Sequence, residues 1–331
     1  MALLLTEADV KKILTMPLAL EAVEDSFRRL AAGTAILHYR QRLHIPRKGL
    51  LNYMGAADET SGYMGLKIYS IARGVARFLV PLYSAESGQL MALIEADYLG
   101  QMRTGAASGV ATRLMARQDA RIVAIIGTGL QARTQLEAIA AVRKIESVRA
   151  FGRDLNRREQ YAGEMAARLQ IAVKAVSSVE EAVRGADIVI TSTNSKSPVL
   201  EGRCLEPGMH INAIGVNQAE KRELDTEAVL RCEVISADSR EQSKIEAGDL
   251  IQAFGDDAPR WDRVLEFSDI VAGKFSGRTS PAQITMFKSN GVATEDIVVA
   301  GRIYELALQR GLGREIPLWG EEARAVEVRG V

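Results

Sequence analysis

The stretch that decides the fold reads Arg121-Ile-Val-Ala-Ile-Ile-Gly-Thr-Gly-Leu-Gln-Ala132, a buried-strand pattern that runs into a glycine-rich turn. A helical pattern follows as far as about residue 142. Gly127 permits a tight turn, Gly129 lets the backbone approach a pyrophosphate, and the small Ala132 allows the helix to pack closely on the strand. The N-terminus of this helix would face the anion. The stretch predicts a nicotinamide- or flavin-binding site, and the alternative is an ordinary strand-turn-helix unit of an α/β protein.

The chain beyond this turn continues to alternate between apolar runs and helical patterns, as parallel βαβ units do. A run of hydroxyl-bearing residues at 191–194 ends one of the strands, at the edge where open α/β sheets bind ligands. The alternation predicts a Rossmann dinucleotide-binding domain over residues 116–293. Its strands are expected at 147–152, 171–176, 187–193, 210–215 and 232–237, and its helices at 154–169 and 178–184.

Length and composition set wider limits. The 331 residues suggest about two domains, and 47% apolar with 25% charged residues is typical of a globular protein. The 42 basic and 42 acidic residues leave no net charge that would favour nucleic acid or an anionic membrane, so small molecules are the expected partners. We expect a cytoplasmic protein, because no run has the length of a membrane span or the pattern of a signal peptide. Cys204 and Cys232 form no disulfide or zinc pattern and are expected to be core residues.

The residues that flank the nucleotide fold predict a second, smaller α+β domain. Residues 1–33 read as a helix pair that ends at Gly33, and short alternating runs between 41 and 95 predict a mostly antiparallel sheet. A helix at 96–116 would enter the nucleotide domain, and one at 294–310 would cross back to the first domain. We therefore assign residues 1–115, completed by 294–331, to substrate binding and dimerisation. The predicted strands are 43–45, 50–54, 65–70, 78–84 and 90–94.

Six segments together resemble the ornithine cyclodeaminase/mu-crystallin family. They are Gly-Leu-Lys-Ile-Tyr-Ser (65–70), Met-Arg-Thr-Gly-Ala-Ala-Ser (102–108), Ile-Gly-Thr-Gly-Leu-Gln-Ala-Arg (126–133), Glu-Pro-Gly-Met-His-Ile-Asn-Ala-Ile-Gly (206–215), Arg-Glu-Leu-Asp (222–225) and Phe-Lys-Ser-Asn-Gly (287–291). The resemblance spans nearly the whole chain. It implies a nicotinamide-dependent oxidoreductase that moves a hydride to or from the α-carbon of an amino or imino acid. It also implies a homodimer, because the family's dimers cover the small sheet with the partner's sheet.

Carried over by motif, the resemblance implies that Arg103 and Lys67 bind the substrate carboxylate, assisted by Arg40. The chemistry agrees, since a guanidinium holds a carboxylate bidentately and an ammonium adds a point charge. Arg42 shares a strand face with Arg40, so the choice of Arg40 depends on its spacing to Met54. Lys67 lies in an apolar stretch, and partial burial there would lower its pKa and suit it to proton exchange with the substrate nitrogen.

The chain departs from the cyclodeaminases of the family after Ile214-Gly215. Those enzymes carry an aspartate there, thought to activate the attacking amine, whereas this chain has Val216-Asn217. Asn217 cannot take a proton, although its amide can orient an imine, a water or a nicotinamide carboxamide; it could instead only close a turn. We therefore predict reduction of a small α-imino acid, or the reverse oxidation, with Lys67 and Asn217 as catalytic residues. The alternatives are an ammonia-eliminating cyclodeaminase and a non-catalytic NADPH-dependent binding protein.

Cofactor choice depends on the end of the second nucleotide-domain strand, Phe151-Gly152-Arg153-Asp154. An acid that binds the ribose diol of NAD is expected there, but Gly152 holds that position and Arg153 suits a 2′-phosphate. We predict NADP(H) in preference to NAD(H). Asp154 is either a helix N-cap or, if the strand end is misplaced, the ribose ligand. The other cofactor contacts that the resemblance implies are Thr104, Gly127, Gly129, Leu130, Gln131, Thr193, Asn194, Val216 and Ser289.

Other titratable residues give weaker signals. Glu246 and Asp249 would share one helical face and could bind a metal, but no His or third carboxylate accompanies them, so we predict a solvated helix face and no metal. His38, His44 and His210 have no serine or cysteine nucleophile pattern around them, which argues against a hydrolase. His210 begins a buried strand and is expected to be structural.

Overall fold

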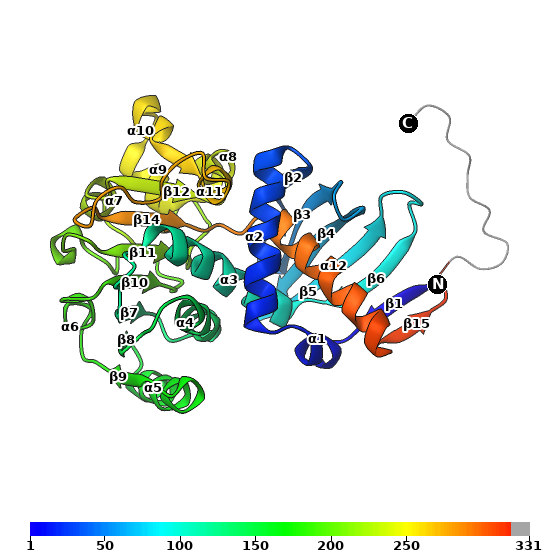
Figure 1. Ribbon diagram of the computed structural model, residues 1–331, viewed down its shortest axis with the longest axis horizontal. Coiled ribbons are helices and arrows are strands. Elements are labelled where there is room, and N and C mark those ends of the chain that lie inside the picture. The colour runs from blue at the N-terminus through cyan, green and yellow to red at the C-terminus, as the bar shows by residue number, and fades with distance from the viewer. Residues whose placement is uncertain (319–331) are drawn as a thin grey trace.

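The computed structural model describes residues 1–318 and contains two β-sheets, with the long helix α3 (Asp97–Met115) running between them (Figure 1). The strands of one sheet come from residues 2–95 and 314–316, and those of the other come from residues 122–288. The segment 319–331, which the sequence assigned to the first domain, lies outside the described residues. No helix within residues 1–318 is long and apolar enough to cross a membrane.

The second sheet is the predicted doubly wound nucleotide fold. Its eight strands run in the order β13-β12-β14-β11-β10-β7-β8-β9, and every neighbouring pair is parallel. The central strands are buried on both faces, which explains why they read as continuous apolar runs rather than as alternating patterns. The strands are β7 (Ile122–Ile126), β8 (Ser147–Phe151), β9 (Ala172–Ala175), β10 (Ile188–Thr191), β11 (His210–Ala213), β12 (Val234–Ala237), β13 (Val264–Glu266) and β14 (Thr285–Lys288).

The helices of this part connect the strands. The helix after the glycine turn runs to Val142, as predicted, and α5 begins directly after Asp154, whose side chain accepts a hydrogen bond from the Arg157 amide. Asp154 is therefore a helix N-cap. The helices are α4 (Leu130–Val142), α5 (Leu155–Leu169), α6 (Val179–Val183), the 3₁₀ helix Gly202–Cys204, α7 (Thr226–Leu230), α8 (Arg240–Glu246), α9 (Gly248–Phe254), α10 (Ala258–Asp262) and α11 (Phe267–Val271).

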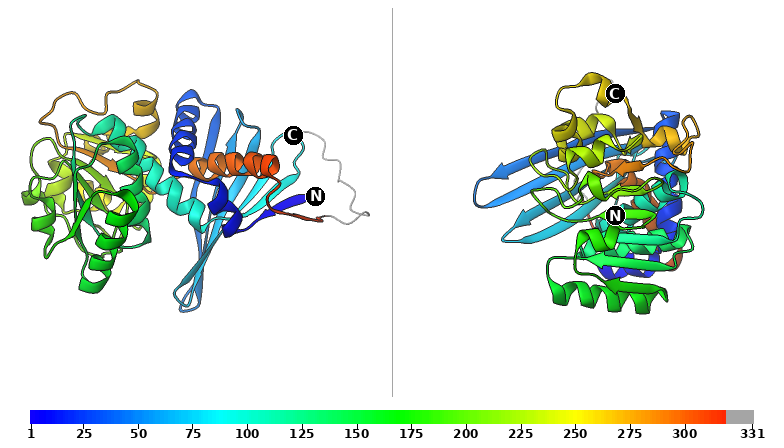
Figure 2. Two further views of the ribbon diagram at one scale, coloured as in Figure 1. Left: turned by 60° about the horizontal axis from the view of Figure 1, so that its bottom comes forward. Right: turned by 90° about the vertical axis from the view of Figure 1, so that its left-hand side faces the viewer.

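The first sheet is mostly antiparallel, as predicted, with the order β15-β1-β6-β5-β4-β3-β2. Its strands are longer than the sequence indicated, because hairpin pairing extends them through residues without clear alternation. Figure 2 shows α2 and α12 on one side of this sheet and the ends of its hairpins reaching beyond both helices. The elements are β1 (Ala2–Leu5), α1 (Glu7–Ile13), α2 (Met16–Ala32), β2 (Ala35–Ile45), β3 (Gly49–Asp58), β4 (Tyr63–Ala72), β5 (Val75–Ser84), β6 (Leu90–Glu95), α12 (Ala293–Arg310) and β15 (Arg314–Ile316).

Two expectations about the first domain have different outcomes. The helix α12 does cross back, and it packs on α2 and on strands β2 to β5. The interpretation of residues 1–33 as helices alone was wrong, because residues 2–5 form β1, which pairs in parallel with β6. A four-residue apolar run does not distinguish a strand from the start of a helix, and only the distant pairing with β6 settles it.

Candidate active site

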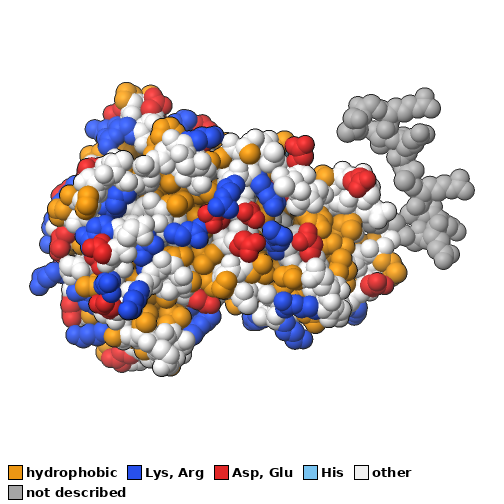
Figure 3. Space-filling model, in the orientation of Figure 1, with side chains coloured by type: hydrophobic (Ala, Val, Ile, Leu, Met, Phe, Trp, Pro, Cys, Tyr) orange, Lys and Arg blue, Asp and Glu red, His pale blue; other side chains and the backbone are white. Residues whose placement is uncertain are grey.

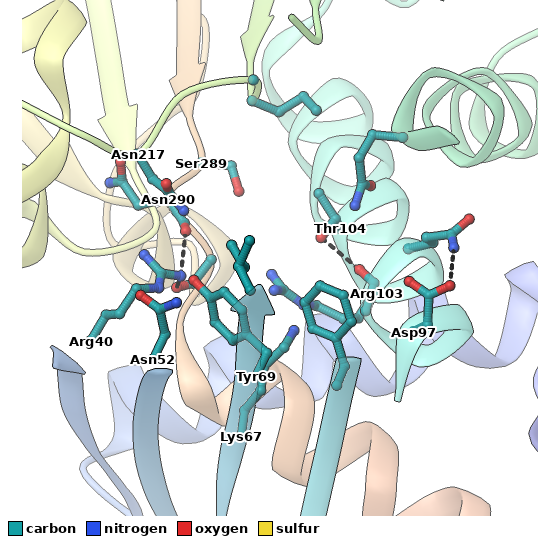
Figure 4. A pocket seen from close by; sticks show the side chains of 18 of the residues that line it. Arg40, Asn52, Lys67, Tyr69, Asp97, Arg103, Thr104, Asn217, Ser289 and Asn290 are labelled. Carbon is teal, nitrogen blue, oxygen red and sulfur yellow. Dashed lines mark hydrogen bonds between the residues drawn. The ribbon is translucent and has the colours of Figure 1, made fainter. Parts of the chain in front are cut away.

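A cavity of about 300 Å³ lies between the two sheets, and both parts of the chain line it. Strands β2 to β5 contribute one wall, α3 a second, and the loops at the carboxyl ends of β11 and β14 a third. The side chains drawn in Figure 4 come from all of these elements. Residues that the sequence proposed for both substrate and cofactor therefore meet at one place, as expected of an open α/β sheet that binds ligands beyond the carboxyl ends of its strands. They are Arg40, Lys67, Arg103, Thr104, Gln131, Asn217 and Ser289.

The three proposed carboxylate-binding cations are all buried at this cavity. Arg40 is 7% exposed, Lys67 3% and Arg103 6%. They come from β2, β4 and α3, so three separate segments of the chain supply one site. Burial of three cations without compensation would be very unfavourable, and each of them is in fact paired with a carboxylate.

Two carboxylates in the first turn of α12 compensate Lys67 and Arg103. Lys67 Nζ lies 2.7 Å from Asp296 Oδ1, and Arg103 Nε lies 3.1 Å from the same oxygen. Arg103 Nη1 also donates to Glu295 Oε2 at 2.8 Å. Both carboxylates are completely buried, so they hold the ammonium and the guanidinium in fixed positions at the cavity wall.

Glu246 compensates Arg40 and Arg42 together. Its Oε1 pairs with Arg40 Nη1, and its Oε2 lies 2.7 Å from Arg42 Nη2. Arg40 Nη2 also donates to the carbonyl oxygens of Asn290 and Gly291, at 2.9 and 3.2 Å. A β-bulge between His38 and Gln41 interrupts the register of β2 just where Arg40 lies.

The interpretation of Glu246 and Asp249 as a solvated helix face was wrong. Each is 1% exposed, and they belong to the separate short helices α8 and α9. Asp249 pairs with Lys288 Nζ at 2.7 Å and accepts hydrogen bonds from the amides of Glu223 and Leu224. The spacing of the two acids suggested one helical face, but their partners come from distant segments of the chain and are recognisable only after folding.

The electrostatics of the Lys67 cluster suit proton transfer near neutral pH. Burial, reinforced by the Arg103 charge, lowers the pKa of Lys67 to about 8, and Asp296 limits this decrease. Burial raises the pKa of Glu295 to about 7, against the opposing effect of Arg103. For Arg103, burial acts to lower the pKa, but Asp296 and Glu295 outweigh it and hold the pKa above its usual value.

The nucleotide side of the site has open backbone where a phosphate would bind. Gly127 has φ +101°, and a Cβ there would lie 2.5 Å from the carbonyl oxygen of Ser192. A Cβ on Gly129 would meet nothing within 4 Å, and no side chain caps the helix α4 that begins after it. The free amides of this first turn and the open space above them fit a pyrophosphate. Leu130, the first residue of α4, is 63% exposed.

The ends of β10 and β11 form the other half of this edge. β7 lies between β8 and β10, so the chain order reverses here, and the turns after β7 and β10 flank the crevice. The buried Glu223 joins the edge by accepting from the Thr193 and Gly215 amides, at 2.6 and 2.8 Å. Asn194 is exposed, whereas Val216 is buried and its carbonyl accepts from Lys288 Nζ at 2.7 Å.

Asn217 and Ser289 belong to the third wall, in the loops after β11 and β14. The backbone carbonyl oxygen of Asn217 accepts from Arg42 Nη2 at 2.8 Å. The Asn217 side chain lies at the cavity near Asn290 (Figure 4). Ser289 Oγ donates to Asp238 Oδ2 at 3.3 Å. Gly127, Gly129, Leu130, Arg153, Thr193, Asn194 and Val216 do not line this cavity.

Arg153 lies on the surface at the end of β8, next to the buried Gly152. A Cβ at Gly152 would lie 2.6 Å from Thr128 Oγ1, so the glycine there also satisfies close packing against the turn. Arg158 Nη1 donates to the Gly152 carbonyl at 3.1 Å.

Some residues of the site gave no readable signal in the sequence. Glu295 and Asp296 are acids in the first turn of a predicted helix, a common helix-dipole arrangement, so nothing distinguished them. Asn52 and Tyr69 lie in the strands β3 and β4 and line the cavity. His210, in contrast, is structural as expected, since it is completely buried with Nδ1 2.9 Å from Thr285 Oγ1.

Comparison with known proteins agrees with this geometry. Residues 1–311 match the model of the ornithine cyclodeaminase/mu-crystallin family. A Δ(1)-pyrroline-2-carboxylate reductase of Bacillus cereus is 35% identical over 267 residues, which cover 76% of this chain and 80% of that protein.

Solved structures are also similar. The Δ(1)-pyrroline-2-carboxylate reductase of Thermococcus litoralis, in complex with NADH and L-proline, is 36% identical with a TM-score of 0.91, and the match covers 95% of this chain and 100% of that one. An archaeal alanine dehydrogenase dimer with bound NAD is 32% identical with a TM-score of 0.90, covering 96% and 99%. The chain therefore belongs to the ornithine cyclodeaminase/mu-crystallin family and is an NAD(P)-dependent oxidoreductase.

Proposed function

We propose that the protein reduces a small α-imino acid to the corresponding amino acid with NADPH. The observation that carries the proposal is the meeting of Arg40, Lys67 and Arg103 at one cavity that also reaches Gln131 and Ser289 of the nucleotide fold. Three buried cations around one cavity suit a carboxylate, and the neighbouring edge of the sheet suits a dinucleotide.

In this proposal the cations bind the α-carboxylate of the substrate. Arg103 keeps its planar fork in place through Glu295 and Asp296, and Arg40 is fixed by Glu246 and two carbonyl oxygens. Because these partners hold the side chains before any ligand arrives, little conformational entropy is lost on binding. The carboxylate would thereby place the imine carbon at the nucleotide side of the cavity.

Lys67 is the proposed proton donor. Conversion of a C=N bond to an amine needs one hydride at carbon and one proton at nitrogen. With a pKa of about 8, Lys67 is protonated in most molecules at neutral pH, yet it releases a proton far more readily than an exposed lysine. Asp296 fixes the position of Nζ at 2.7 Å, and the amide of Asn217 is available to orient the imine or the cofactor carboxamide.

The residues at the glycine turn fit the pyrophosphate of the cofactor, since the open space at Gly129 adjoins the uncapped N-terminus of α4. When bound, a reduced nicotinamide supplies the hydride. We propose that Thr104, Gln131, Thr193, Asn194, Val216 and Ser289 line its path, together with Leu130. Exposed Arg153 would contact the 2′-phosphate, which supports NADP(H) over NAD(H).

A steady-state panel tests this function. NADPH oxidation is measured with pyruvate plus ammonia, pyruvate plus methylamine, and Δ1-pyrroline-2-carboxylate, and the amine product is identified. Turnover of any of them supports an imine reductase. Release of ammonia from ornithine without net cofactor consumption would instead identify a cyclodeaminase, a reaction disfavoured because Asn217 cannot act as a base. NADPH binding without turnover of any imine would indicate a binding protein.

We also propose that the protein is a homodimer through the open face of the first sheet. Ile36, Leu43 and Leu66 on this face are 63%, 58% and 38% exposed, and apolar faces of this kind are usually covered by a partner. Light scattering at micromolar concentration is expected to give twice the chain mass, and a monomeric mass would contradict the proposal.

A further inference from the structure

Four side chains form a row across the cavity wall at one level of the first sheet. Arg42 lies opposite Asn52, Asn52 opposite Tyr69, and Tyr69 opposite Phe78. Cross-strand partners point to the same face of a sheet, and all four line the cavity. Lys67 lies two residues before Tyr69 on β4, so the row is about 7 Å along the strand from the ammonium. A substrate held by its α-carboxylate at Lys67 would extend its side chain along this row.

Asn52, in the middle of the row, is a buried amide without a partner. Its side chain is 1% exposed, and its Nδ2 makes no hydrogen bond to any of residues 1–318. Figure 4 shows Asn52 beside Arg40 and Tyr69 at the cavity. Leaving a buried donor unsatisfied is costly, so such a group at a cavity wall indicates a ligand that supplies an acceptor oxygen.

The charge at this end of the row indicates which kind of oxygen. Arg40 and Arg42 share one carboxylate, Glu246, while the other hydrogen-bond partners of both guanidiniums among residues 1–318 are neutral. Two positive charges on one negative charge leave one positive charge uncompensated. The acidic side chain that lines the cavity elsewhere, Asp97, is exposed and belongs to α3, where Figure 4 shows it on the far side of Arg103.

The opposite end of the row is aromatic. The rings of Tyr69 and Phe78 stack with centroids 5.1 Å apart, and Lys67 Nζ lies 5.7 Å from the Phe78 ring. This aromatic pair covers the ammonium from solvent, so the polar end of the row, at Arg42 and Asn52, is where a charged substrate group would bind.

We propose that Arg42 and Asn52 form a subsite for a second carboxylate, at the end of the substrate side chain. This inference rests on the proposed imino-acid reduction and names its substrate class: an α-imino dicarboxylic acid. A protonated imine with one carboxylate has no net charge, whereas a second carboxylate gives one negative charge that matches the surplus positive charge of the arginine pair.

Equilibrium binding tests the subsite without relying on turnover. Amino acids are titrated by calorimetry into the full chain saturated with NADP⁺: aspartate and glutamate, their amides asparagine and glutamine, and the apolar counterparts 2-aminobutyrate and norvaline. One of the two dicarboxylic ligands is expected to bind at least about tenfold more tightly than its apolar counterpart and its amide. A preference for an apolar counterpart would overturn the proposal.

Variants of Asn52 test whether this side chain causes the preference for a dicarboxylic ligand. Asn52→Leu, which keeps the approximate volume but removes the donor, is expected to reduce the preference for the dicarboxylic ligand about tenfold, and Asn52→Asp to abolish it by charge repulsion. Asn156→Leu, the same change at an exposed position of α5, serves as the control for folding and overall affinity. An unchanged preference in Asn52→Leu would overturn the proposal.

Turnover of the matching imines distinguishes a failure of the dicarboxylate subsite from a failure of the proposed imine reduction. NADPH oxidation with oxaloacetate or 2-oxoglutarate plus ammonia is compared with 2-oxobutyrate or 2-oxopentanoate plus ammonia, and the amino acid product is quantified. Reduction of the apolar imines alone would overturn the dicarboxylate subsite and leave the imine reductase intact. An Asn52-dependent binding preference without reduction of any imine would support the subsite and contradict the proposed reaction.

Discussion

The side-chain lining of the cavity, here called the substrate wall, and the glycine-turn edge beside the cavity, here called the nucleotide wall, are prepared for their ligands by different means. The nucleotide wall consists of backbone: a glycine turn, open space above Gly129 and the uncapped amides of α4. The substrate wall consists of side-chain charges buried behind the surface, where Asp296, Glu295 and Glu246 hold Lys67, Arg103 and Arg40. Backbone amides need no partner to keep them in place, whereas each buried cation needs its own carboxylate.

The two walls therefore differ in how they tolerate substitution. A side chain added at Gly129 fills space that the fold does not use. A side chain removed from the substrate wall leaves a buried charge without its partner, so function and stability change together. Substitutions on the two walls distinguish a loss of ligand binding alone from a combined loss of function and stability.

The largest effect is expected for Lys67→Ala. Loss of the proposed proton donor should lower kcat by about 10²- to 10⁴-fold. Asp296 keeps Arg103 as a partner at 3.1 Å, so the variant should still fold and bind NADPH with nearly normal affinity. Steady-state kinetics and calorimetric titration of NADPH check this, and a variant with near-normal kcat would show that Lys67 does not transfer the proton.

Arg103→Ala should rank second, with a loss of about 2–4 kcal/mol in kcat/KM from the missing carboxylate contact. The pKa of Glu295 is expected to rise further without the neighbouring guanidinium, so part of the lost charge pairing is offset by protonation. NADPH affinity should change little. Equal losses in imino-acid kinetics and NADPH affinity would place Arg103 in the cofactor site instead.

Gly129→Val and Gly127→Ala form a matched pair on the nucleotide wall. Valine at 129 projects into open space, so thermal unfolding should be unchanged while affinity for NADPH and NADH falls about 100-fold or more through steric exclusion of the pyrophosphate. Alanine at 127 meets the Ser192 carbonyl at φ +101°, so stability should fall by about 1–3 kcal/mol. Normal cofactor affinity in a folded Gly129→Val protein would refute the assigned phosphate site.

Arg153→Ala tests the preference between cofactors. Loss of an exposed contact to the 2′-phosphate should weaken NADPH binding roughly ten- to a hundredfold and leave NADH almost unchanged. Titration of both cofactors into both proteins measures the ratio. A wild-type protein that prefers NADH would reject the assignment.

The smallest effect is expected in the pH dependence of kcat/KM, which should change about tenfold per pH unit. Lys67 must be charged to donate a proton, so kcat/KM for imine reduction should fall as pH rises through about 8, and amine oxidation should rise over the same range. Arg103, Arg40 and Asp296 face the ammonium, and among these only Asp296 favours its charged form. Asp296→Asn should therefore move the alkaline limb to lower pH, whereas an unchanged limb would assign it to another group.

Much of the nucleotide fold was predictable from local sequence. The strand-turn-helix at Arg121–Ala132 has a shape that its own residues dictate, and parallel strands buried on both faces read as apolar runs. The central strand β14 was not among the predicted strands, although its end carries the Phe-Lys-Ser segment of the family resemblance. Its four residues, Thr-Met-Phe-Lys, include only two apolar side chains, so no apolar run identifies it.

The candidate site was predictable only in part. The cations Arg40, Lys67 and Arg103 could be named because they lie in motifs, but their partners could not, since an acid in a helix's first turn usually faces solvent. The surface charges of Figure 3, where basic and acidic side chains are interspersed, look no different in the sequence from Glu246 or Asp296. Burial separates them, and burial is a property of the packed chain.

Local sequence was enough to predict the dinucleotide fold, the family and the three cations at the cavity, because each is recognised from a motif of residues that are neighbours in the chain. Only the packed chain shows which carboxylates hold those cations, and that Asn52 Nδ2, opposite Arg42 in the sheet, has no hydrogen-bond partner among residues 1–318. These relations depend on the register of β2, β3 and β4 and on the return of α12 across their sheet. A shift of one residue in that register would turn Asn52 away from the cavity, and no local pattern in the sequence encodes the register.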